Sequence, residues 1–209
     1  MTGVWTNREK TVFERLDTPM RIQEWLDATS YSLDPIYRSP RRVMKDRRAH
    51  CVDGGLFAAA ALRRLKFPPL VVWITAENDD GHMLAVFKRR GLWGAVAKSN
   101  YPGMRYREPV YRTIRELVMS YFNEYFNTLG QRTMRGFAGP MNLRRHDRLE
   151  WMTEEAGLER LLDVELERLP VEAVLPRNAK TWLTPVDPIV MKSGSMGVDP
   201  RGQYKPKAG

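Results

Sequence analysis

The feature that most constrains this chain is an apolar stretch that begins at its only cysteine, Cys51. Two glycines, Leu56, Phe57 and four consecutive alanines follow within ten residues, and the run ends before Pro68. A helix that is apolar on almost every side is buried in a water-soluble protein, so the pattern predicts a helix at the centre of the core. Cys51 then lies in the first turn of that helix.

This position suits a nucleophile. The first N–H groups of a helix lack intrahelical partners and the helix dipole favours negative charge there, so the thiol of Cys51 can be shifted towards the reactive thiolate. The alternative is an inert side chain, because a free cysteine is often buried and behaves as a small hydrophobic residue.

A histidine further along the chain favours the catalytic interpretation. His82 follows the polar turn Asp79–Gly81 and opens an apolar run that is typical of a strand. A catalytic cysteine requires an imidazole that is close in space but not in sequence. Strands are predicted over residues 70–75, 82–90 and 92–99, the last two joined by a hairpin at Gly91. This order of helix, strand and strand can return His82 to the start of the buried helix.

The residues around Cys51 and His82 form an ordered set. Those that carry it are Arg48, Cys51, Asp53, Ala60, Leu62, Arg63, Leu65, Pro69, Val72, Gly81, His82 and Trp93. Over roughly residues 38–100 this set resembles the transglutaminase-like superfamily of papain-type cysteine enzymes. The resemblance implies an α+β fold with a papain/transglutaminase-like core, in which a central buried helix packs on a small antiparallel sheet and extra helices flank it.

The resemblance also implies a reaction. Cys51 attacks an amide or thioester carbonyl of a peptide or amide substrate, His82 carries the proton, and water or an amine completes a hydrolase or acyltransferase cycle. The family's third member is an Asp, which is Ala97 here. Ser99 or Asn100 could orient the imidazole instead, since papain-like enzymes use Asn in that role. The alternative hypothesis is a catalytically silent scaffold or binding protein that contacts acidic partners.

Local signals place other helices. Thr18 and Ser39 each precede a proline, and this pair predicts a helix start. We expect a third helix to begin at Pro109 and continue to residue 126, an irregular segment over residues 129–150, and a helix capped by Thr153.

The chain divides into a single domain, residues 1–187, and a basic tail, residues 188–209. Gly, Pro, Ser and Lys dominate the tail, which predicts disorder.

Composition narrows the function classes. No apolar run approaches the roughly 20 residues of a membrane span, so we expect a cytoplasmic protein without membrane contact, and the single cysteine fits a reducing compartment. The net charge of +9 permits weak contact with nucleic acid, but we find no motif for specific binding. One Cys without a second Cys or a spaced His is poor support for a metal site, and phosphate-binding glycine motifs are missing. We expect no cofactor.

Overall fold

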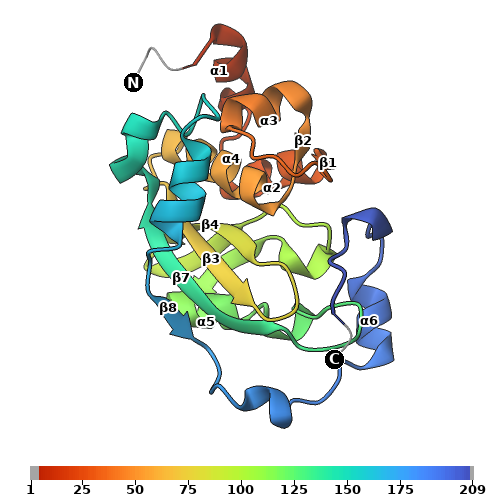
Figure 1. The fold of residues 1–209 in the computed structure, drawn as a ribbon. Coiled ribbons are helices and arrows are strands. Elements are labelled where there is room, and N and C mark those ends of the chain that lie inside the picture. The colour runs from red at the N-terminus through yellow and green to blue at the C-terminus, as the bar shows by residue number, and fades with distance from the viewer. Residues whose placement is uncertain (1–4, 208–209) are drawn as a thin grey trace.

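The computed structural model describes residues 5–207, which form a six-stranded antiparallel sheet covered by helices (Figure 1). The strand order is β6-β5-β4-β3-β7-β8. Its strands are β3 (Leu70–Ala76), β4 (His82–Arg89), β5 (Leu92–Val96), β6 (Arg107–Tyr111), β7 (Met134–Asn142) and β8 (Val171–Ala173). A separate parallel pair joins β1 (Ser30–Tyr31) to β2 (Arg48–Ala49). The structure is therefore α+β, as the sequence predicts.

Most of the α-helices lie near the N-terminus, in the red and orange part of Figure 1. The α-helices are α1 (Asn7–Glu14), α2 (Pro19–Asp27), α3 (Pro40–Asp46), α4 (Cys51–Arg64), α5 (Ile114–Met119) and α6 (Pro188–Gly194). Short 3-10 helices are η1 (Pro102–Met104), η2 (Phe122–Glu124), η3 (Leu143–Leu149), η5 (Ala179–Thr181) and η6 (Pro200–Gly202), and η4 (Arg160–Leu166) is a stretch of π-helix. None of the helices between residues 5 and 207 has the length and apolar character needed to cross a membrane.

The central helix α4 is buried over residues 52–62, as its sequence predicts. His50 and Asp53 form a capping box at its first turn. The helix lies so close to the sheet that a Cβ on Gly55 would stand 2.6 Å from the Cγ atom of Met83 on β4. Glycine is needed there because a larger residue would separate the helix from the strand that carries His82.

Alternating residues of β4 serve two cores on opposite faces of the sheet. Met83, Ala85 and Phe87 pack with α4, whereas Leu84 and Val86 pack with α5. This period of two is the ordinary consequence of strand geometry. It determines which face of the sheet each residue near the site can reach.

The local signals for helix starts and for the hairpin are confirmed. Thr18 and Ser39 are the N-caps of α2 and α3, and each side chain accepts a hydrogen bond from a backbone N–H of the first turn. The hairpin between β4 and β5 turns at Arg90 and Gly91, which have φ angles of 50° and 84°. Helix α3 ends at Asp46, and Arg47 follows it with a φ of 54°.

The expected long helix from Pro109 is wrong. Pro109 lies inside β6, and only residues 114–119 of the apolar stripe are α-helical. Strand β6 is at the edge of the sheet, where a proline can be accommodated because the missing N–H need not join the ladder. Apolar spacing alone did not distinguish one long helix from a strand, a short helix and a 3-10 turn.

Two further expectations were wrong downstream. The segment 129–150 contains β7, which pairs with β3 over its length. Its glycines and proline are absorbed by register shifts opposite β3, and Gly139 has a φ of 104°. Thr153 does not cap an α-helix; the helical turn here is η4, which has no side-chain cap. Leu158, Leu161 and Leu162 are nevertheless buried.

The structure describes residues 188–207 of the tail, for which composition predicts disorder. Asp187 is the N-cap of helix α6, and its side chain accepts hydrogen bonds from two backbone N–H groups. The chain then returns through η6 to the sheet, and Asp199 and Lys207 are held by side chains of the main domain. Composition reports how little apolar surface a segment has, but it does not report hydrogen bonds to its backbone. Residues 1–4 and 208–209, which belong to the predicted domain and tail, lie outside the described part.

Candidate active site

A cavity of about 730 Å³ lies where the first turn of α4 meets the start of β4. Both Cys51 and His82 line it. Aromatic side chains form much of the remaining wall: Tyr31, Tyr37, Trp73, Tyr101, Tyr125, Phe126 and Tyr204. A concave, partly aromatic pocket with a few polar groups is the usual form of a ligand site.

Cys51 is the first residue of α4 and is half-buried. Its Sγ atom lies 3.8 Å from the carbonyl oxygen of Gly81, the residue before His82. Burial raises the pKa of the thiol to about 12, and the carboxylate of Asp80 adds to the rise, while a hydrogen bond from the backbone N–H of Met83 opposes it. Desolvation therefore outweighs the effect of the helix N-terminus, and the thiol is protonated at neutral pH.

His82 is 5% exposed, and its Nε2 atom lies 2.8 Å from the carbonyl oxygen of Met104 at the end of η1. A carbonyl oxygen only accepts, so Nε2 carries the proton and Nδ1 keeps the free lone pair of the neutral ring. Burial lowers the pKa of His82 to about 4, although the bond to Met104 acts in the other direction. The imidazole is therefore neutral at pH 7 and has a fixed tautomer.

The sulfur and the imidazole approach the start of β4 from different sides. Cys51 comes from the α4 face, and the His82 ring lies on the α5 face, with its centroid 6.5 Å from that of the Tyr121 ring. Within residues 5–207, no hydrogen bond joins Sγ to the imidazole directly. The structure thus brings the two groups to one cavity but leaves them unpaired.

The residues proposed to orient His82 are held elsewhere. Both polar atoms of the Asn100 side chain bind the backbone of Asp199. The Ser99 hydroxyl accepts from the backbone N–H of Tyr101, although Ser99 also lines the cavity. Ala97 is buried on the same face of the sheet as His82 and offers only a methyl group. The hydrogen-bond partner that the structure gives the imidazole is therefore the Met104 carbonyl and not Ser99 or Asn100, and no side-chain pattern could have indicated it.

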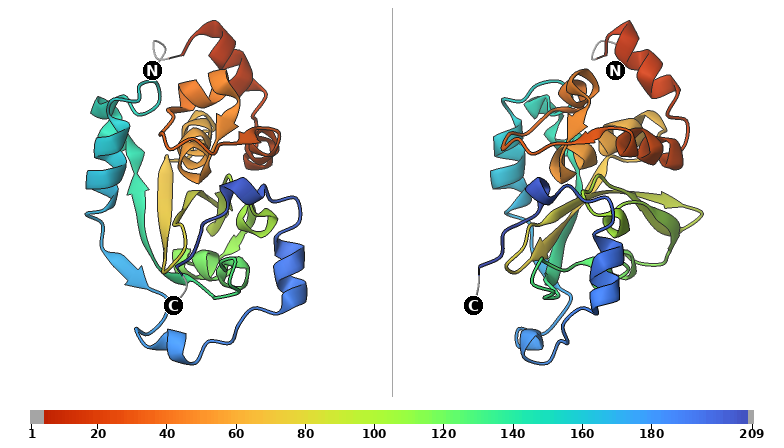
Figure 2. Two further views of the ribbon diagram at one scale, coloured as in Figure 1. Left: turned by 45° about the vertical axis from the view of Figure 1, so that its right-hand side comes forward. Right: turned by 90° about the vertical axis from the view of Figure 1, so that its right-hand side faces the viewer.

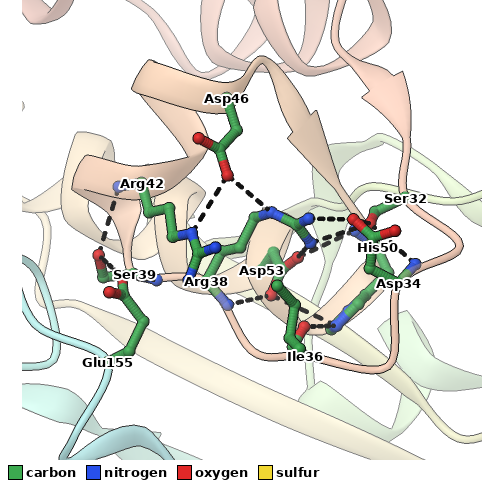
Figure 3. Close-up of polar contacts among 10 residues, drawn as sticks. All are labelled: Ser32, Asp34, Ile36, Arg38, Ser39, Arg42, Asp46, His50, Asp53 and Glu155. Atoms are coloured by element: carbon green, nitrogen blue, oxygen red, sulfur yellow. Dashed lines mark hydrogen bonds and ion pairs between the residues drawn. The ribbon is translucent and has the colours of Figure 1, made fainter.

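A polar network supports the first turn of α4 (Figure 3). His50, the N-cap, accepts from the N–H of Val52 through Nδ1, and its Nε2 lies 3.0 Å from the carbonyl oxygen of Ile36. Asp53 is fully buried and accepts from the backbone N–H of Arg38 at 2.7 Å. The Arg38 guanidinium also binds Asp34, Asp46 and Ser32. Through His50 and Asp53, the network fixes the segment before α3 against the first turn of α4, which carries the thiol.

The paired side chains around Cys51 bear on whether the cavity could hold a metal ion. Across residues 5–207 there is no cluster of three His, Cys, Asp or Glu side chains placed to hold an ion. A site built from Cys51, Asp53 and His82 would need the carboxylate of Asp53, whose two oxygens accept from the backbone N–H groups of Arg38 and His50. The polar groups of the cavity lining include a thiol, two imidazoles, carboxylates, phenols and the guanidinium of Arg201.

Sequence reasoning missed two parts of the cavity wall. Tyr31 comes from the segment before α3, and residues 201–204 come from the tail. His50, which its place beside Cys51 predicts to be structural or a wall of the site, caps α4 and also lines the cavity. No protein-family model matches the chain, and no curated protein matches it.

Proposed function

We propose that the protein is a cysteine hydrolase or acyltransferase with a transglutaminase-like, papain-type core, acting on an amide or thioester. The observation that carries the proposal is the meeting of Cys51 and His82 at one cavity, at the N-terminal end of a buried helix. Antiparallel strands behind that helix suit the same fold. Cys51 would be the nucleophile and Nδ1 of His82 the proton acceptor.

The protonation states define how the cycle would start. A neutral thiol and a neutral imidazole are the stable pair in the free protein, since burial disfavours both charged forms. Attack then requires general-base catalysis, in which the thiol proton leaves as the sulfur–carbon bond forms. Because no hydrogen bond joins the described imidazole of His82 to the sulfur, bound substrate must bring the two groups together. The N–H groups of the first turn of α4 are suited to the developing oxyanion.

The test is formation of a covalent acyl-enzyme. A panel of short peptide thioesters is incubated with the protein, and intact mass and product release are measured. We expect an adduct on Cys51 that Cys51→Ser abolishes, and turnover that His82→Ala lowers by about 10²–10⁴-fold. His146→Ala is the matched control, since His146 is outside the cavity lining. Thiol-independent turnover, or no adduct with any member of the panel, would refute the proposal.

A second candidate is a binding protein that keeps this fold without turnover. The raised pKa of Cys51, the lowered pKa of His82 and the methyl group of Ala97 in place of a carboxylate favour it. It predicts saturable ligand binding in the cavity that Cys51→Ser leaves unchanged, with no adduct at any pH.

A further inference from the structure

The C-terminal segment (Asp199–Lys207) borders the cavity that Cys51 lines. In the left view of Figure 2 it is the dark blue stretch that follows α6 and passes in front of the sheet, below the N-terminal helices. Its residues 201–204 form part of the cavity wall. The chain thus places a piece of its own polypeptide along one wall of the candidate active site.

One end of this segment is held by Asn100, which is 6% exposed. Its Nδ2 donates to the carbonyl oxygen of Asp199 at 2.9 Å, and its Oδ1 accepts from the N–H of the same residue at 3.0 Å. We call such a pair, in which one amide side chain binds both main-chain groups of one residue, a main-chain clamp. It is indifferent to the side chain of the residue that it holds.

The other end is held by a second main-chain clamp. Nδ2 of Asn78 donates to the carbonyl oxygen of Lys207 at 3.1 Å, and Oδ1 accepts from its N–H at 2.8 Å. Asn78 lies in the turn between β3 and β4 with a φ of 57°, and its carbonyl accepts from Asn127. Two asparagines from separate loops therefore hold the backbone of residues eight positions apart in the chain.

The middle of the segment fits closely between the clamps. A Cβ on Gly202 would lie 2.8 Å from Cδ2 of Leu33 and 3.1 Å from Cε1 of Tyr31. Tyr31 and Cys51 both line the cavity. Gln203 adds a side-chain hydrogen bond to Tyr101. The contacts favour a small residue at the position of Gly202, while the two clamps engage only the backbone.

We propose that the C-terminal segment lies in a groove for a linear polypeptide, that this groove borders the cavity and holds its occupant through the main chain by Asn78 and Asn100, and that the segment occupies the groove in cis. A peptide bound in trans takes the same course and requires a small residue three positions after the one that Asn100 holds. The inference rests on the proposed function only in naming such a peptide as the substrate of Cys51; the groove itself is independent of turnover.

The test uses the full-length protein and a fluorescent, end-capped peptide with the sequence of residues 198–207. In the wild type the segment competes at an effective concentration in the millimolar range, so the peptide binds weakly. Gly202→Val should displace the segment and improve binding at least about tenfold, since the added side chain meets Tyr31 and Leu33. Lys205→Val, at an exposed position, is the matched control and should behave as the wild type.

A peptide N-methylated at the positions of Asp199 and Lys207 separates main-chain from side-chain binding. It keeps every side chain but loses both donors, so it should bind Gly202→Val at least about tenfold less tightly. Equal binding of the methylated peptide, or no gain with Gly202→Val, overturns the inference.

Amide exchange keeps the test decisive if a variant unfolds. In the folded wild type, the amides of Asp199 and Lys207 should be protected; Asn100→Ala should expose the first and Asn78→Ala the second. Unprotected amides in the wild type overturn the inference. Peptide binding without a thiol-dependent adduct would support the groove and refute the proposed enzyme. Adducts on Cys51 together with no effect of N-methylation would support the enzyme and refute the groove.

Discussion

The reactivity of Cys51 towards iodoacetamide gives the most direct check on the electrostatics of the site. Burial raises the pKa of this thiol from an ordinary value of 9.0 to about 12. Since only the thiolate is alkylated, folding should slow the reaction, and unfolding in concentrated urea should restore it. The comparison is therefore between the folded protein and the urea-unfolded chain, with the alkylation rate measured at several pH values.

The magnitude follows from the two pKa values. At pH 7–8 the folded thiol is ionised about a thousandfold less than an ordinary one. A more basic thiolate is also a better nucleophile, with a Brønsted coefficient of about 0.5, which returns about a factor of 30. The folded protein should thus react at least about 30-fold more slowly than the unfolded chain, before any steric protection by the cavity.

The assay is simple because Cys51 is the only cysteine. Intact mass follows one adduct with time, from pH 6 to pH 9, in the wild type and in His82→Ala. We expect the rate to rise about tenfold per pH unit without a plateau, because the whole range lies below the pKa. The variant should show the same profile, since the neutral imidazole does not stabilise a thiolate.

A different profile would refute this reasoning. Labelling faster than in urea, with a plateau below pH 8.5 and a loss in His82→Ala, would mean that the free protein already holds a thiolate–imidazolium pair. In that case burial does not control the site, and the acyl-transfer chemistry needs no rearrangement on substrate binding.

Three further predictions concern stability, each measured by urea unfolding. His82 has a pKa of about 4 in the folded protein against 6.5 when unfolded, so its contribution to the free energy of unfolding is present above pH 6.5, and about 3 kcal/mol is lost as the pH falls to 4. His82→Gln should remove this dependence of stability on pH, and an unchanged dependence would contradict the prediction. Gly55→Ala should cost about 1–3 kcal/mol, because the added Cβ overlaps Met83, and it should cost less in a protein that also carries Met83→Ala. Equal costs in the two backgrounds would show that Met83 is not the source of the strain. Arg38→Met should cost about 3–5 kcal/mol, because it leaves the buried Asp53 carboxylate without the guanidinium that pairs with it. The loss should be smaller near pH 4, where the carboxylate can take up a proton, since burial raises its pKa. A loss independent of pH would exclude the unpaired carboxylate as the cause.

Several features were determined by short stretches of sequence. The buried helix from Cys51, the caps at Thr18 and Ser39 and the hairpin at Gly91 were all predicted from neighbouring residues. Each depends on interactions within a few positions, namely a cap, a fixed proline φ, a run of apolar side chains or a glycine dihedral. The start of a strand at His82 belongs to the same class.

Only the tertiary structure decided the rest. Pro109 sits in a strand because that strand is at a sheet edge, and β7 forms because β3 offers a ladder to a glycine-containing segment. The partner of the His82 ring is a backbone carbonyl, and the partners of Asn78 and Asn100 are backbone groups far along the chain. Every residue carries such groups, so no residue type signals them. The protonation states of Cys51 and His82 likewise follow from how much water the fold removes, a property of the packed chain and not of either side chain.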